Sequence, residues 1–368
     1  MKGQWIGNYN GTNQGQIIIE LDEQPNNYVG WAYLFDSTPG YPPSSAQVIT
    51  HSKDVDQENE FLVGPVNVGI ASVVSWQNEK EKYPGFIFPT KAKVKMKVDD
   101  QSLSLEWTTD IGTNGSAHLP RPKSNEPSEI TPLKITTWSD FKQHVSTLPT
   151  RKYIFRGQER SLEWRLRTHF HRTGRADLKR LIYQDIPELH RATIHVTSHK
   201  FNLFDADERG AFYALVQHHG YPTPLLDWSY SPYVAAYFAF SGLKKVDLDQ
   251  NKSCRIFLFD RGQWDRDFNQ LVDVAGVQPH FSVFSPMPLG NHRMSQQQAL
   301  TTLTNVDDIE SYIRNREQEK GKTYLEAIDL PNRERAEIMK DLEMMGITAA
   351  SMFPGIDGAC QYQKERFF

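Results

Sequence analysis

The spacing of apolar residues changes its period part-way along the chain, and this change constrains the fold more than any other feature of the sequence. Before about residue 137, strand-length runs such as QGQIIIELDE and NYVGWAYLFDS are separated by turn-forming stretches such as DEQPNN. Residues 91–98 alternate lysine with apolar residues, as in a strand with one solvent-exposed face. We therefore predict an antiparallel β-barrel or sandwich over residues 1–118.

A proline-rich stretch, HLPRPKSNEPSEITPLK, follows the predicted β-domain and is interpreted as a linker over residues 119–136. Beyond it, helical periods alternate with single strands. WSDFKQHVSTL and ERGAFYALVQHHG have helical spacing, whereas CRIFLFDRG and TYLEAIDLP are typical of strands. Residues 137–368 therefore predict a separate α+β domain, and a length of 368 residues is typical of two domains.

Composition limits the classes of function. Hydrophobic residues make up 38% of the chain, so packed cores are expected, and the formal net charge of -4 gives no overall positive field for nucleic acid. The two cysteines, Cys254 and Cys360, form no CxxC pair, which argues against a zinc site or a disulfide framework. The N-terminus has no signal-peptide pattern, and no apolar run approaches the roughly 20 residues of a membrane span. We therefore expect a soluble cytoplasmic protein with no membrane partner.

An arginine follows an apolar strand in the motif YIFRGQ. Because a strand end can open onto a pocket, Arg156 is a candidate for holding a phosphate or carboxylate through two parallel hydrogen bonds. Gly157 lets the backbone turn sharply or approach another element closely. The alternative is a structural arginine in a surface ion pair.

The segment QHHGYPTPLLDWSYSPYVAAYFAF places three further polar groups around one predicted strand. His218 ends a predicted helix, where the helix dipole favours the protonated imidazole. Asp227 follows an apolar pair and must either lose hydration or find a partner. Ser231 precedes a proline and is predicted to cap the next helix. We expect these three residues to share one cleft with Arg156, although ion pairing, helix capping and core packing would explain them as well.

Further candidates lie elsewhere in the second domain. His169 and His171 are two apart, and His195 and His199 are four apart on a predicted helix, but no acidic ligand accompanies either pair and no metal is expected. In NHRMSQQQAL, two side chains four apart would share a helix face and could present a guanidinium and an amide to a ligand, with a solvated face as the alternative. These are Arg293 and Gln297.

Together these segments resemble the FRG domain family, named for the triplet seen here at residues 155–157. YIFRGQ, QHHGYPTPLLDWSYSPYVAAYFAF, NHRMSQQQALTTL and MFPGIDGA occur in the order that this family shows. The resemblance covers roughly residues 137–368 and departs from the family pattern at residues 298–300 and 355–357. It implies a toxin role in bacterial phage defence and ligand contacts from Gly157, Gln158, Arg293, Gln297 and Asp357.

The chain is also similar to arginine-type ADP-ribosyltransferases, which place an Arg at the end of the first core strand and a Ser-x-Ser element after the second. YIFRG and WSYSPYVAAYFA are similar in both respects. This comparison implies an ADP-ribosyltransferase-like fold, with NAD as cosubstrate held by Arg156 and with Ser229 and Ser231 shaping the nicotinamide pocket. No motif marks the catalytic carboxylate, for which the candidates are Glu326, then Glu310, Asp227 and Asp357.

Three classes of function stay open at this point. The first is an enzyme that cleaves the nicotinamide–ribose bond of NAD and transfers ADP-ribose, which requires an anion grip and a carboxylate in one dry pocket. The second is a module that binds a nucleotide or nucleic acid without chemistry, and the third is a hydrolase using His218 and Asp227. The β-domain is expected to act as a sensor or accessory domain. The macromolecular target stays undetermined, and a homo-oligomer stays open.

Overall fold

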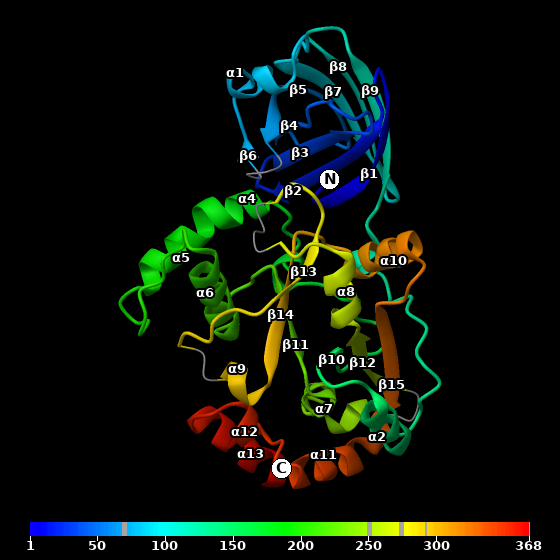
Figure 1. Ribbon diagram of the computed structural model, residues 1–368, viewed down its shortest axis with the longest axis vertical. Helices are drawn as coiled ribbons and strands as arrows, with labels where there is room; N and C mark the ends of the chain where they lie inside the picture. Colours follow the sequence, from blue (N-terminus) through cyan, green and yellow to red (C-terminus); the bar gives the residue numbers. More distant parts are fainter. Residues whose placement is uncertain (68–71, 249–251, 272–275, 291–292, 368) are drawn as a thin grey trace.

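The computed structural model describes residues 1–67, 72–248, 252–271, 276–290 and 293–367. The chain forms an N-terminal β-barrel and a larger body of helices around a second sheet (Figure 1), which confirms the predicted change of architecture. Among these residues, no helix is both long enough and apolar enough to cross a membrane.

Eight antiparallel strands close the barrel. They follow one another around the ring in sequence order, and the β4–β5 and β1–β9 pairings close it, while β6 (Ser72–Val73) adds a short hairpin partner to β5. The ring strands are β1 (Gly3–Gly11), β2 (Gly15–Glu23), β3 (Tyr28–Asp36), β4 (Ser44–Ile49), β5 (Asp56–Asn67), β7 (Lys91–Val98), β8 (Ser102–Thr109) and β9 (Asn114–Pro120).

Side-chain alternation decides which barrel residues face inward. On β7, Ala92 and Met96 are buried inside the barrel while the lysines are exposed, as the sequence predicts. On β2, Ile17 and Ile19 face the barrel core, whereas Ile18 packs outward against Val277 of the second domain. A strand buried on both faces needs apolar residues at successive positions, which explains the unbroken run of isoleucines.

The second domain is built on a six-stranded sheet in the order β13-β14-β11-β10-β12-β15, and every neighbouring pair is antiparallel. Strands far apart in the sequence therefore become neighbours, which is typical of an α+β domain. The strands are β10 (Ile154–Gln158), β11 (Leu225–Ser229), β12 (Ser253–Phe259), β13 (Phe281–Phe284), β14 (Ala299–Thr304) and β15 (Leu325–Pro331).

Helices cover both faces of this sheet. On one face pack α2 (Trp138–Thr147), α7 (Pro232–Phe240) and α11 (Arg335–Met344), and on the other pack α8 (Arg261–Asp267) and α10 (Ile309–Lys320). α6 (Ala206–His218) packs beside β11 and β14 over its own apolar cluster. Further helices are α3 (His169–Arg172), α9 (Arg293–Gln296), α12 (Ala349–Met352) and α13 (Ile356–Phe367).

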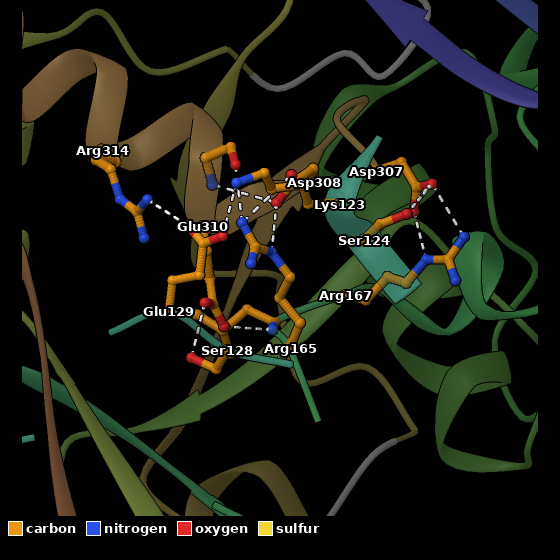
Figure 2. Close-up of polar contacts among 12 residues, drawn as sticks. Lys123, Ser124, Ser128, Glu129, Arg165, Arg167, Asp307, Asp308, Glu310 and Arg314 are labelled. Carbon is orange, nitrogen blue, oxygen red and sulfur yellow. Dashed lines mark hydrogen bonds and ion pairs between the residues drawn. The ribbon is translucent and has the colours of Figure 1, made fainter. Parts of the chain in front are cut away.

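The segment predicted as a linker is tied to the second domain (Figure 2). The hydroxyl of Ser124 donates to Asp307 at 2.8 Å, and that of Ser128 donates to Glu310 at 2.8 Å. Farther along, the backbone N–H of Leu133 donates to the carbonyl of Ala327 in β15 at 2.8 Å. Both serines are buried, so this part of the segment is packed although its composition is typical of a loop.

Polar side chains on the outer wall of the barrel dock it on the second domain. The Gln4 amide donates to the carbonyl of Asn305 at 2.6 Å and accepts from the N–H of Asp307 at 2.9 Å. Asp22 accepts from the N–H of Ala176 at 2.7 Å and pairs with Arg175 at 2.7 Å. The polar groups of Gln4 and Asp22 thus have hydrogen-bond partners in the second domain, so the two domains meet in one specific arrangement.

Candidate functional site

The candidate site lies where two central strands separate. β10 pairs with β12 at five successive positions, but it pairs with β11 at one position, Phe155 with Ser229. Beyond that pair the guanidinium of Arg156 bridges the two strands, with Nη1 donating to the carbonyl of Asp227 at 2.7 Å. The gap opens onto a cavity of about 410 Å³, which is within the range of small-molecule sites.

Arg156 has one donor without a partner in the part of the chain that the structure describes. It lines the cavity, and its Nε is buried with no hydrogen-bond partner among the described residues. Burial lowers the pKa of Arg156 to about 10, and the cation of Arg172 adds to the effect. The side chain is therefore still a cation at neutral pH, and an anion in the cavity would relieve its unfavourable environment.

Two further arginines line the same cavity from distant parts of the chain. Arg172 ends α3 and is positioned by two hydrogen bonds to the carbonyl of Arg167, from Nε at 3.1 Å and Nη2 at 3.0 Å. Burial lowers the pKa of Arg172, and the Arg167 cation lowers it further. Arg293 begins α9 and stacks over the ring of Phe353, with 5.1 Å from its guanidinium carbon to the ring centroid. The three cations give this part of the cavity wall a positive charge.

Two carboxylates face this basic cavity. The Asp227 side chain is exposed to it and accepts from Nε2 of Gln217 at 2.7 Å. The Gln217 amide is oriented in turn by the hydroxyl of Thr223, which donates to its oxygen. Glu159, directly after β10, also lines the cavity and lies against Gly242, where an added Cβ would come within 1.9 Å of its Oε1. Asp227 is thus held in place beside the arginines.

His218 lies in the cavity wall as a neutral imidazole. Burial lowers its pKa to about 4, and the charges of Arg293 and His219 lower it further. The expectation that the helix dipole would favour the protonated form is therefore wrong, because desolvation outweighs the dipole at this helix end. A neutral imidazole can accept a hydrogen bond from a ligand at pH 7.

The part of the chain that carries most of this geometry matches a known family. The family model described as FRG domain matches residues 151–247. The chain contains an FRG domain. No curated protein and no solved structure matches the chain. The FRG match includes β10, α3, α6, β11 and α7, whereas Arg293 and Phe353 reach the cleft from beyond it.

Several polar residues predicted as ligand contacts support the scaffold of the FRG domain. Ser229 donates to the carbonyl of Gln297 at 2.7 Å, and Gln297 donates through Nε2 to the carbonyl of Met352 at 3.0 Å. Gln158 donates to the carbonyl of Trp164 at 2.8 Å. These three side chains line the cavity, but their hydrogen bonds tie α9, α12 and the strand ends together.

Ser231 and Gly157 have structural roles that the sequence indicated. Ser231 accepts from the N–H of Val234 at 3.3 Å and caps α7, and it lies outside the residues that line the cavity. The predicted shared cleft therefore holds Arg156, His218 and Asp227 without Ser231. Gly157 lies within β10, and a Cβ there would come within 1.9 Å of the Ala235 carbonyl oxygen, so the glycine allows α7 to pack closely on the strand.

Of the four carboxylates considered in the comparison with ADP-ribosyltransferases, Asp227 lines the cavity and the other three lie elsewhere. Glu326 is on β15 opposite Leu258, and β12 separates it from β10, so it does not line the cavity. Glu310 is buried at the start of α10, where it accepts from the N–H of Leu166 at 2.8 Å and from Ser128. Asp357 is an exposed residue of α13 and also lies outside the cavity lining. The position of Glu326 follows from the sheet order, which places β15 at the edge of the sheet.

Sequence reasoning missed Arg172 and Glu159. Arg172 follows the histidine pair in THFHR, which was considered for metal binding alone. There, His171 is buried and pairs with Thr168 at 2.7 Å, whereas His169 is exposed. In the described part of the chain, no group of three or more histidine, cysteine, aspartate or glutamate side chains could hold a metal. The first two residues of the third motif, 291–292, lie outside the described residues.

Proposed function

We propose that the FRG cleft binds NAD and cleaves the bond between nicotinamide and ribose, passing ADP-ribose to water or to a macromolecular acceptor. The observation that carries this proposal is the placement of Asp227 in the same cavity as Arg156, Arg172 and Arg293. A site that only grips an anion has no need of a carboxylate, because a negative group weakens anion binding. A site that cleaves a glycosidic bond needs one to stabilise the positive charge that develops on the sugar.

Each group has a role in this chemistry. The arginines hold the diphosphate, and the rings of Trp164, Phe238 and Phe353 offer apolar faces to the bases. As the bond from the ribose anomeric carbon to nicotinamide breaks, its electron pair leaves with neutral nicotinamide. Asp227 stabilises the resulting cation, and the acceptor nucleophile adds its electron pair to that carbon and releases a proton. Glu159 is the second carboxylate available to take that proton.

A non-catalytic nucleotide-binding module is the second candidate. It is favoured by the scaffold hydrogen bonds of Ser229, Gln158 and Gln297, which engage polar groups that a transferase could otherwise use on its substrate. Under either proposal the ligand is an anionic nucleotide. Loss of NAD would arrest the cell that contains the protein, in keeping with the cytoplasmic toxin role in phage defence that the FRG resemblance implies.

The test compares wild type with Arg156→Ala and Arg156→Lys for nicotinamide release and for NAD binding by calorimetry. Both variants should lose turnover, since a point charge on lysine does not reproduce the planar fork of arginine. Thermal melting checks the fold, because Arg156 also bridges β10 and β11. Expression in cells, with NAD, labelled adducts and growth measured, covers an acceptor absent from the purified assay. Binding without turnover or adducts supports the second candidate, and a wild type without binding, turnover or adducts refutes both.

A further inference from the structure

One end of the N-terminal barrel is filled and the other is hollow. Trp5, Leu21, Leu103 and Leu119 are fully buried at the filled end, and the indole of Trp5 donates to the carbonyl of Met1 at 2.8 Å. The hollow end encloses a cavity of about 500 Å³, called the lumen below. Its lining includes the turns after β1 and β8, at Thr12, Asn13, Ile111 and Thr113, and residues 85–89 before β7.

The lumen exists because small residues stand where a filled barrel would have large ones. Ala32, Ala46 and Ala92 line it from β3, β4 and β7. An eight-stranded barrel has an interior that side chains can just fill or that can hold one small ligand. Atoms that line an empty space lose dispersion contacts, so a guest molecule would restore contacts that the chain itself does not make. The rest of the wall is mainly apolar or aromatic: Ile17, Ile19, Leu34, Val48, Phe61, Met96, Leu105 and Trp107.

The charge of the lining limits what the guest can be. Among the described residues that line the lumen, Asp36 is the one carboxylate, and lysine, arginine and histidine are absent. The hydroxyl of Tyr9 donates to Asp36 at 3.3 Å, and burial, followed by the charge of Asp36, raises the pKa of Tyr9. An anionic guest would meet Asp36 with no cation to balance it, whereas a neutral or amine-bearing guest would not.

Aromatic and apolar side chains form an apolar rim along part of the mouth of the lumen. The indole of Trp76 stacks on Phe88 at 5.0 Å between ring centroids, and Phe86 meets Tyr41 edge-on at 5.1 Å. Beside them, Ile87 is 72% exposed and lines the lumen opening. An exposed apolar rim leading into an apolar cavity is typical of an entrance for an apolar ligand.

We propose that the lumen is a binding site for one small apolar molecule that is neutral or carries a single amine, with its body among the apolar strands and its polar end at Tyr9 and Asp36. This inference does not depend on the NAD chemistry of the cleft.

A matched pair of fluorescent probes tests the proposal on the full chain. N-phenylnaphthylamine is neutral and apolar, and anilinonaphthalene sulfonate adds a negative charge to the same ring system. The neutral probe should bind with one site per chain, and the sulfonate should bind at least about 10-fold more weakly. Asp36→Asn should narrow that difference. Equal binding of the two probes to the wild type, or no binding of the neutral probe, would overturn the proposal.

Filling variants decide whether the probe occupies the lumen. Ala92→Phe projects a ring into the cavity, whereas Lys93→Phe places the same ring on the outer face of the same strand. The first should abolish binding of the neutral probe and the second should leave it unchanged. If Ala92→Phe does not fold by circular dichroism, Ala46→Phe fills the lumen from β4. Undiminished binding by a folded filling variant would place the probe elsewhere and refute the site.

Discussion

The cleft and the lumen are cavities of similar size with opposite linings. The cleft, of about 410 Å³, gathers three arginines, two carboxylates and a neutral histidine, whereas the lumen, of about 500 Å³, is walled mainly by apolar side chains and three alanines. A site based on charge depends on a few particular residues, and motifs reveal them. A site based on missing volume depends on alanines at inward positions, which a sequence does not distinguish from an ordinary barrel core.

The largest expected effect concerns the charge in the cleft. Asp227→Asn should lower the rate constant for NAD cleavage at least about 100-fold with little change in NAD affinity, because the carboxylate acts on the transition state. Steady-state nicotinamide release measures kcat and KM separately. Glu326→Gln on β15 and Asp36→Asn in the lumen are controls that should retain wild-type rates. A rate loss in either control equal to that of Asp227→Asn would show that carboxylates outside the cleft also act in the reaction.

The next largest effect should be a pH dependence of stability that arises at the interface between the barrel and the second domain. Glu20 is buried at this interface beside Gln4, with Asp22, Asp177, Arg175 and Lys179 nearby, and burial raises its pKa from the ordinary 4.5 to about 8. Between these values the folded state holds a proton that the unfolded chain has released. The free energy of unfolding should therefore fall as pH rises from 4.5 to 8.

Glu20→Gln should remove that fall, so that the variant is more stable than wild type at pH 8 by an amount on the order of a few kcal/mol. Urea unfolding at pH 5 and pH 8 measures it, with the exposed Glu106→Gln as control. Burial also lowers the pKa of Lys179 from 10.5 to about 8. Between these values the unfolded chain holds a proton that the folded protein has released, so the free energy of unfolding should rise with pH. Lys179→Met should remove this rise. An unchanged slope in Glu20→Gln would mean that Glu20 is ionised in the folded protein.

A third prediction compares the stability cost of a larger side chain in the wall of each cavity. Gly157→Ala forces a Cβ against the Ala235 carbonyl and should cost about 1–3 kcal/mol of stability. Ala46→Val adds two methyl groups to the hollow lumen and should cost less than about 1 kcal/mol, because empty space receives them. Chemical denaturation gives both values. Equal costs would show that the lumen collapses or fills in solution.

The smallest expected effect concerns the segment between the domains. Ser128 donates to Glu310 and accepts from Arg255 at 2.7 Å, so Ser128→Ala should cost about 1 kcal/mol and speed proteolysis between residues 120 and 132. Ser116→Ala, on an exposed face of β9, is the control. Rapid cleavage of the wild type in this segment would show instead that the contacts in Figure 2 open readily.

Local patterns predicted most elements of the fold. The Lys-apolar alternation of β7, the Ser231 cap of α7 and the helical spacing of α6 depend on backbone geometry within a few residues, and each is present. The helix predicted to run through His199 ends at Thr193, and His199 instead pairs with Glu208 at 3.1 Å. A helical period alone does not settle where a helix stops when a tertiary partner competes for its side chains.

The sequence by itself determined that a β-domain precedes an α+β domain and that Arg156, His218 and Asp227 belong to the FRG motifs. Only the tertiary structure decided that β10 and β11 separate, that Arg172 and Glu159 join the cleft, and that Glu326 stays outside it. Periodicity and capping are set by neighbouring residues, and a sequence records them directly. Sheet order and barrel closure are set by contacts between residues far apart in the chain, so the composition of a cavity emerges only when the strands are in place.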